Sequence, residues 1–165
     1  MLLTDYRLRS PSLTDLDRCY AIERSAYPGD EAATREKIEK RIRMYPDGFM
    51  LLEIDGVIAG MINSACADKV VMADSAFKEL VGHDPAGRQA VILSLAVHPD
   101  HQGQGLAGLL LVNFIQRMKR LHKQSIELMC REEHIALYRR FGFNYVRPSA
   151  SAHGGLAWHE MLLRL

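Results

Sequence analysis

Two glycines in the stretch Gln102-Gly103-Gln104-Gly105-Leu106-Ala107 have the spacing of a phosphate-binding turn. They follow an apolar run and precede a segment with helical periodicity, so the turn is predicted to open a helix. Backbone N–H groups at a helix start are unpaired and carry partial positive charge, which attracts phosphate. Glycines there allow unusual φ angles and let a ligand approach the backbone. Taken alone, the pattern is equally compatible with an ordinary helix start that contains flexible glycines.

Two familiar phosphate motifs are excluded. The Walker motif needs Gly-Lys-Ser/Thr, which the chain lacks. The Rossmann fingerprint needs three spaced glycines in a chain-initial βαβ unit, with an acidic residue about 20 positions later. The kind of phosphate-containing ligand must therefore be inferred from the elements around the turn.

Apolar periodicity predicts a strand–helix–strand unit around the turn, with a buried central strand at 89–98, a helix at 106–121 and a parallel strand at 125–130. Asp55-Gly56 between apolar runs predicts a hairpin. The segment 68–88 has weak periodicity and is predicted to contain one helix around 75–81. The other predicted elements are strands at 6–9, 49–54, 57–65, 143–147 and 156–163, and helices at 13–26, 31–44 and 134–141. Together they predict one α/β domain over residues 1–165, without repeats or linkers.

Composition narrows the functional classes. Lys and Arg number 21 against 20 Asp and Glu, so no basic field indicates nucleic acid as a partner. No apolar run approaches the roughly 18–20 residues that cross a bilayer, and the first residues lack a signal-peptide pattern. Cys19, Cys66 and Cys130 are far apart, which argues against disulfides and a zinc site. We expect a cytoplasmic protein without a metal; a homodimer stays open.

The stretch from Leu95-Ala96-Val97-His98-Pro99 through Ala107 resembles the mark of the GNAT superfamily of acyl-CoA N-acyltransferases. That signature motif is Gln/Arg-x-x-Gly-x-Gly/Ala after a buried strand of the type Leu-x-Val-x-Pro. The order of predicted elements is similar as well, over the whole chain. Leu128-Met129-Cys130 and the Tyr138-x-x-Phe141 spacing are further similar to arylalkylamine (serotonin) N-acetyltransferases and their bacterial relatives.

This resemblance implies the GNAT fold, a mixed sheet of about seven strands whose central parallel strands splay apart, and acetyl-CoA as cosubstrate. The pantetheine arm would pair with the backbone near Leu95, Ala96 and Val97. The pyrophosphate would lie on the turn formed by Gln102, Gly103, Gln104, Gly105, Leu106 and Ala107.

Tyr138 matches the tyrosine that similar enzymes use as general acid toward the CoA sulfur. A phenol, with an ordinary pKa of about 10, keeps its proton at neutral pH. The alternative is an aromatic core residue on an amphipathic helix. No equivalent candidate exists for the base, because Val91 and Leu93 stand where arylalkylamine enzymes carry two histidines. Alternation along the strand predicts Ser94 on the opposite face.

The acceptor side is predicted from the first two helices and the loop 149–155. Tyr27 and Pro28 match an apolar wall for the amine, and His153 is the leading histidine. Glu23 on the first helix is a further candidate for the base, but a single Glu on an amphipathic helix usually faces solvent. The chain is therefore predicted to acetylate a small primary amine by direct attack in a ternary complex. The alternatives are a protein N-terminal or lysine acetyltransferase and a non-catalytic acyl-CoA-binding sensor.

Overall fold

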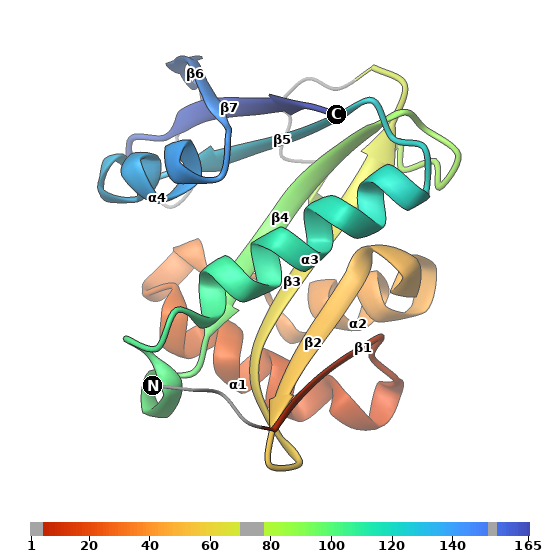
Figure 1. Ribbon diagram of the computed structural model, residues 1–165, viewed down its shortest axis with the longest axis vertical. Helices are drawn as coiled ribbons and strands as arrows, with labels where there is room; N and C mark the ends of the chain where they lie inside the picture. The colour runs from red at the N-terminus through yellow and green to blue at the C-terminus, as the bar shows by residue number, and fades with distance from the viewer. Residues whose placement is uncertain (1–4, 70–77, 152–154) are drawn as a thin grey trace.

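The computed structural model describes residues 5–69, 78–151 and 155–165. Seven strands form one mixed sheet in the order β1-β2-β3-β4-β5-β7-β6 (Figure 1). The strands are β1 (Tyr6–Arg9), β2 (Phe49–Ile54), β3 (Val57–Ala67), β4 (Gln89–Val97), β5 (Ser125–Cys130), β6 (Asn144–Pro148) and β7 (His159–Arg164). The helices are α1 (Leu16–Ala26), α2 (Arg35–Met44), α3 (Leu106–Arg120) and α4 (Ile135–Arg140). The predicted α/β fold with about seven strands is confirmed.

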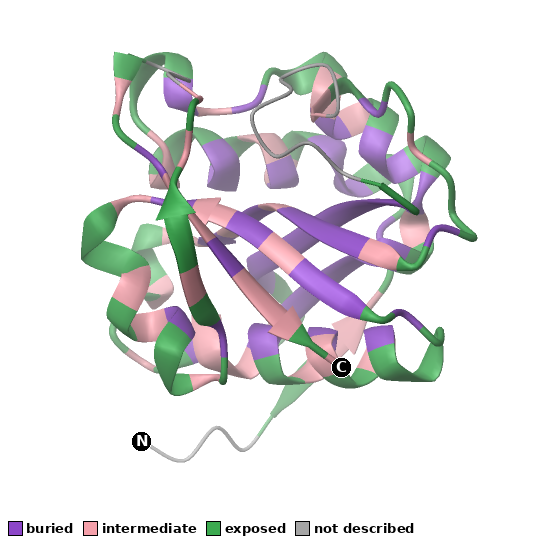
Figure 2. Cartoon of the chain, turned by 90° about the horizontal axis from the view of Figure 1, so that it is seen from above, coloured by how far each residue is buried: buried purple, intermediate pink, exposed green. Residues whose placement is uncertain are grey.

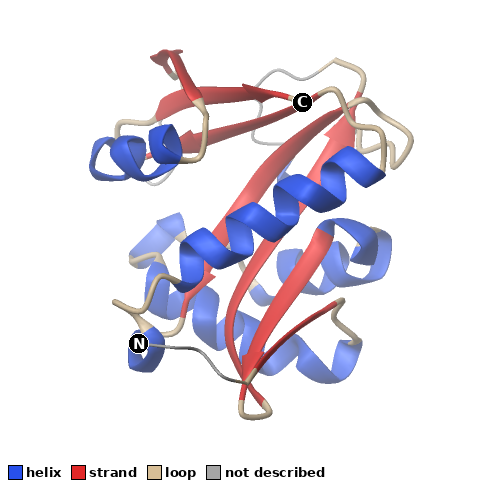
Figure 3. Cartoon of the chain, in the orientation of Figure 1, coloured by secondary structure: helices blue, strands red, loops and turns tan. Residues whose placement is uncertain are grey.

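Helices cover both faces of the sheet (Figure 3). On one face α1 and α2 pack against β2 and β3, with Ile22, Ile38 and Met61 in the shared core. On the other face α3 lies across the sheet and buries Leu110 and Phe114 against it. The alternation of side chains along each strand supplies the two apolar faces that these helices cover. Among the described residues, no helix is long and apolar enough to cross a membrane.

The middle of the sheet is the most buried part of the molecule. All residues of β3 except Val57 are buried, and Figure 2 shows the central strands purple along much of their length. Asp55 and Gly56, with φ angles of 51° and 80°, close the β2–β3 hairpin. Two consecutive residues with positive φ match the right-handed twist of the flanking strands, so the Asp-Gly signal is confirmed.

The parallel pairing of β4 and β5 is short. It joins Gln89 to Ser125, Ala90 to Ile126 and Val91 to Glu127, and the registered pairing ends there. Beyond that point the two strands diverge in Figure 1. The register of β4 against β3 also shifts, because Asn63 faces Ser94 while Ser64 faces Ile92. The predicted splay at the centre of the sheet is therefore present.

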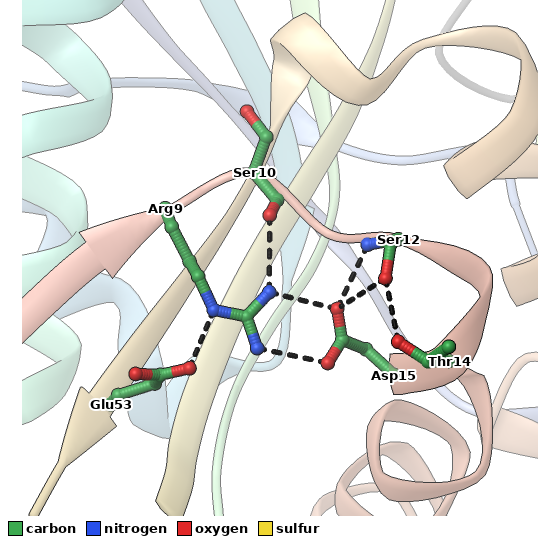
Figure 4. A network of polar contacts seen from close by, with 6 residues as sticks. All are labelled: Arg9, Ser10, Ser12, Thr14, Asp15 and Glu53. Carbon is green, nitrogen blue, oxygen red and sulfur yellow. Dashed lines mark hydrogen bonds and ion pairs between the residues drawn. The ribbon is translucent and has the colours of Figure 1, made fainter. Parts of the chain in front are cut away.

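The edge strand β1 is tied to α1 by charged side chains (Figure 4). The guanidinium of Arg9 donates to both carboxylate oxygens of Asp15, at 2.8 and 2.9 Å, and to Glu53 on β2. The same Asp15 carboxylate accepts from the backbone N–H of Ser12 at 2.8 Å. The hydrogen bond from Arg9 holds the pKa of Asp15 below its usual value, because its effect is larger than the opposite effect of burial. This network fixes where the first helix begins relative to the sheet.

Several predicted boundaries differ from the structure. The second helix begins at Arg35 instead of residue 31, because the Thr34 side chain accepts from the Lys37 N–H and caps the helix there. Residues 29–31 form a separate short 3-10 turn. The last strand begins at His159, three residues later than predicted. Of the helix predicted around 75–81, residues 75–77 lie outside the described residues, and 78–81 form a short 3-10 helix and turn.

Core packing under α3 yields a stability prediction. Phe114 is fully buried between α3 and the sheet, so Phe114→Ala should lower the free energy of unfolding by about 3–5 kcal/mol. Val112 lies on the same helix with 39% of its surface exposed, and Val112→Ala should change stability by less than about 0.5 kcal/mol. Denaturant midpoints compare the two variants; equal losses would contradict this packing.

Candidate active site

A cavity of about 620 Å³ opens where β4 leaves β5. Its walls come from the end of α1, the β4 edge, the start of α3 and the helix α4. The size suits an extended ligand, since binding clefts typically measure about 300–1,000 Å³. It is lined by Ser25, Ala26, Tyr27, Leu95, Ala96, Val97, His101, Gln102, Gly103, Gly105, Leu106, Ala107, Gly108, His134, Leu137, Tyr138, Arg140 and Phe141.

The glycine turn forms one end of this cavity. Gly103 and Gly105 both have a φ of 77°, a conformation that side chains disfavour, and Gly105 is the N-cap of α3. A Cβ added at either glycine would meet no atom within 4 Å, so the backbone faces open space. The unpaired amides of the first helical turn therefore face a place that fits a phosphate. This placement favours the ligand-binding interpretation of the turn.

The edge of β4 that faces the cavity is held by side chains. The Tyr27 hydroxyl donates to the Leu95 carbonyl at 2.8 Å and accepts from the Leu95 N–H at 3.1 Å. Nε2 of Gln102 donates to the Val97 carbonyl at 3.1 Å. These are the backbone groups that β5 leaves unpaired when it diverges. An extended amide-containing ligand placed along β4 would exchange these side-chain bonds for its own.

Tyr138 projects from α4 into the same cavity. Its side chain is buried, and its ring lies edge-on to Phe143 with 5.6 Å between the ring centroids. Burial, followed by the neighbouring Tyr27 and Cys130, raises the pKa of Tyr138 well above 10. The phenol therefore stays protonated at neutral pH and is able to donate its proton to a developing anion in the cavity.

These features coincide with what a family comparison finds. The model of the acetyltransferase (GNAT) family matches residues 15–143. The chain belongs to the GNAT acetyltransferase family. That match runs from α1 through α4 and ends just before β6, and it includes β4, the glycine turn and Tyr138.

Individual relatives of this GNAT chain are distant. It is 25% identical over 162 residues to serotonin N-acetyltransferase of Mesocricetus auratus, which covers 96% of this chain and 76% of the relative. It is 26% identical over 147 residues to the N-alpha-acetyltransferase of Sulfurisphaera tokodaii, covering 87% and 83%. A GNAT-like decarboxylase, GphF, solved with isobutyryl-CoA, superposes with a TM-score of 0.83 at 18% identity, covering 96% and 98%. The expected GNAT fold is confirmed.

Family membership identifies the general activity and the cosubstrate. The chain is an acetyl-CoA-dependent N-acetyltransferase of the GNAT family. The fit to a CoA thioester is visible in the cavity, where the open glycine turn suits the phosphates and the β4 edge suits the pantetheine amides. Among the described residues, no group of three or more His, Cys, Asp or Glu side chains is arranged to hold a metal.

The structure brings together most of the residues predicted for the cofactor and the reaction. Of that set, only Gln104 does not line the cavity. Of the predicted acceptor residues, Tyr27 lines it, Pro28 is exposed outside it, and His153 lies outside the described residues. Sequence reasoning missed the cavity positions of His134 and Arg140, although both fall within the helix predicted at 134–141, which carries Tyr138.

A second, much smaller cavity of about 20 Å³ lies on the other side of β4. Leu93 and Ser94 both line it, together with Glu23 and Arg41. The prediction that alternation separates Ser94 from Leu93 is wrong, because the register shift between β3 and β4 interrupts the alternation here. Leu93, one of the two positions that carry histidine in arylalkylamine enzymes, thus shares a cavity with a carboxylate.

Cys130 is the last residue of β5, and Arg131 follows it. Cys130 is buried, and burial raises the pKa of its thiol to about 11, so the thiolate that would act as a nucleophile is scarce at neutral pH. A guanidinium nitrogen of Arg131 lies 4.0 Å from a carboxylate oxygen of Glu31. Arg131 therefore reaches toward the segment between α1 and α2, away from the glycine turn.

The glycine turn gives a binding prediction with a matched control. Gly105→Ala should weaken acetyl-CoA binding about tenfold, because a methyl group enters the space beside the helix amides. Gly82 has a similar φ of 84° and equally open surroundings, but does not line the cavity. Both alanine variants should lose about 1 kcal/mol of stability from the positive φ. Calorimetric titration that finds equal affinities for the two variants would contradict the assignment.

Proposed function

We propose that this chain transfers the acetyl group of acetyl-CoA to a small primary amine by direct attack in a ternary complex. The whole chain would act as one domain. Tyr138 would be the general acid, and the backbone of residues 102–107 would hold the pyrophosphate. Leu95, Ala96 and Val97 would hold the pantetheine arm along β4.

The cavity at the β4–β5 divergence carries this proposal. It places the glycine turn at one end and the Tyr138 side chain beside the free edge of β4. A CoA thioester that lies along this edge would bring its sulfur to the tyrosine while its phosphates reach the turn. The Leu95 N–H, once released by Tyr27, would be a donor for the thioester carbonyl, where negative charge develops during attack.

Direct attack is favoured over an acyl-enzyme route. The thiol of Cys130 is a neighbour of Tyr138, and burial raises the pKa of this thiol to about 11. Its Sγ lies 3.7 Å from the Met161 sulfur inside the core. An amine that attacks the thioester itself needs only correct placement, a proton acceptor and the phenol of Tyr138 to protonate the leaving sulfur.

A small acceptor is favoured over a protein substrate by the surroundings of Arg131. This residue at the end of β5 and Glu31 between α1 and α2 approach to 4.0 Å, so two separate walls of the acceptor side meet. Such a closed approach suits a compact amine better than an extended peptide. The relatives named above include both a serotonin and an N-alpha-acetyltransferase, so the two classes need a direct comparison.

That comparison is an acetylation assay with aralkylamines, polyamines and short peptides at equal concentration. Release of the CoA thiol and mass of the product are followed together. The proposal expects kcat/KM for at least one small amine to exceed that for every peptide by tenfold or more. Faster turnover of peptides would instead support a protein acetyltransferase, and binding of acetyl-CoA without any turnover would support a sensor.

The role of Tyr138 is tested by removing only its hydroxyl. Tyr138→Phe should lower kcat about 10²-fold or more and leave acetyl-CoA affinity within about twofold. The control is Tyr145→Phe, which removes a hydroxyl that lies 2.9 Å from His159 Nδ1 and does not line the cavity. Steady-state rates between pH 6 and 9 measure the effect. A Tyr138→Phe enzyme as fast as the control at every pH would exclude the phenol from the reaction.

A further inference from the structure

The cavity of about 20 Å³ beside β4 has the size of one water molecule. The charged and polar side chains of Glu23, Arg41 and Ser94 line it, and at most 2% of each residue's surface is exposed. Buried charges without full hydrogen bonding are costly, and proteins retain them chiefly where they have a function. The buried charges of this cavity therefore indicate a functional role for its polar groups.

Two polar atoms in this cluster have no hydrogen-bond partner among the described residues. They are Oε1 of Glu23 and Nε of Arg41. The other groups of both residues are engaged, since Glu23 Oε2 accepts from the Ala33 N–H at 2.8 Å. Arg41 donates to Asn63 Oδ1 at 3.1 Å and to Ser94 Oγ at 3.2 Å. One acceptor and one donor thus remain on the two charged residues, and Nδ2 of the neighbouring Asn63 is a further donor without a partner among the described residues. A bridging water satisfies such an acceptor and donor pair.

This cluster adjoins the reaction centre through two direct links. Ser94 immediately precedes Leu95, whose N–H and carbonyl face the cavity for the thioester. Glu23 lies one helical turn before Tyr27, whose hydroxyl bonds those same Leu95 groups. The carboxylate therefore lies on the α1–α2 side of β4, beside Ser94 and the segment between the two helices.

We propose that Glu23 is the proton acceptor for the attacking amine, acting through a water held between its Oε1 and Arg41 Nε. This inference rests on the proposed amine acetylation. Glu23 supplies, from α1, the base that β4 lacks at Val91 and Leu93. Arg41 and Ser94 are positioning residues that orient the carboxylate and the water.

The proton balance is complete. The ammonium group of the acceptor gives one proton to the water, which passes one of its own to Glu23 and leaves the carboxyl neutral. The free amine attacks the thioester carbon, the C–N bond forms and the C–S bond breaks. Tyr138 protonates the departing sulfur and becomes a phenolate, and the extra proton on the new amide nitrogen is transferred to this phenolate and restores the phenol. Glu23 returns its proton to solvent after product release.

The charges that face Glu23 come from several elements. On its own helix Tyr27 lies one turn away; α2 contributes Arg41 and Lys37, and the segments before α2 and β4 contribute Glu31 and Lys78. Burial is the largest effect and raises the pKa of Glu23, while the Ala33 N–H, Arg41, Ser94 and Lys78 oppose it. A base with a raised pKa is active above that value, so turnover should fall as the pH drops through it.

The test replaces the carboxylate by its amide. Glu23→Gln should lower kcat at pH 7 about 10²-fold or more, abolish the acidic limb of the pH–rate profile and leave acetyl-CoA affinity within about twofold. The matched control is Glu36→Gln, the same change at an exposed position of α2. A Glu23→Gln enzyme with the rate and pH profile of the wild type would overturn the proposal.

A second variant and a direct titration keep the test decisive if the Glu23→Gln variant does not fold. Glu23→Asp keeps a carboxylate and should retain an acidic limb at a reduced rate. In the wild-type protein, ¹³C NMR of labelled glutamate carboxyls should show one signal that titrates above the ordinary range, at the pH where kcat falls. A mismatch between the two midpoints would overturn the inference alone. A wild-type enzyme that acetylates no amine would overturn the proposed function and this inference with it.

Discussion

The divergence of β5 from β4 after Val91 is the constraint on which the active site depends. A strand in the middle of a sheet must satisfy its N–H and carbonyl groups on both sides. Where β5 diverges, the N–H and carbonyl of Leu95 form hydrogen bonds with the Tyr27 hydroxyl instead. The carbonyl of Val97 accepts from the Gln102 side chain. A side-chain bond is exchanged for a ligand bond more readily than a strand pairing is broken. The edge is therefore stable without ligand and remains available to one.

The register shift in β4 gives the strand two functions. A regular strand would send alternate residues to opposite faces, but the shift places Leu93 and Ser94 at one cavity on the α1–α2 side. Leu95 and Val97 line the larger cavity, whose walls come from the end of α1, the start of α3 and α4. The same four residues thus lie between the proposed thioester site and a buried polar cluster, within a single strand. A proton acceptor and an acyl donor can be close without competing for space.

Local signals in the sequence predicted much of this architecture. The apolar run of β4, the periodicity of α3 and the Asp-Gly pair are properties of neighbouring residues, and the elements formed where they indicated. The interior position of Arg41 could not be predicted in this way. Its helix is rich in charges, and its partners Asn63 and Ser94 lie 22 and 53 positions away. The register shift likewise depends on pairing with β3, and the slip of one residue leaves no mark on the apolar pattern of β4 itself.

The two oxygens of Glu23 explain how one buried carboxyl serves both structure and chemistry. Oε2 accepts the Ala33 N–H and holds the segment between α1 and α2, which forms the acceptor side. An oxygen engaged by a backbone donor is a poor site for a proton, so proton uptake falls to Oε1, which has no hydrogen-bond partner among the described residues. Because the oxygens are separate, Glu23 can change its charge without releasing the segment it anchors. A histidine on β4 would offer a base but no such anchor, which accounts for a carboxylate on α1 in a chain whose strand is apolar at Val91 and Leu93.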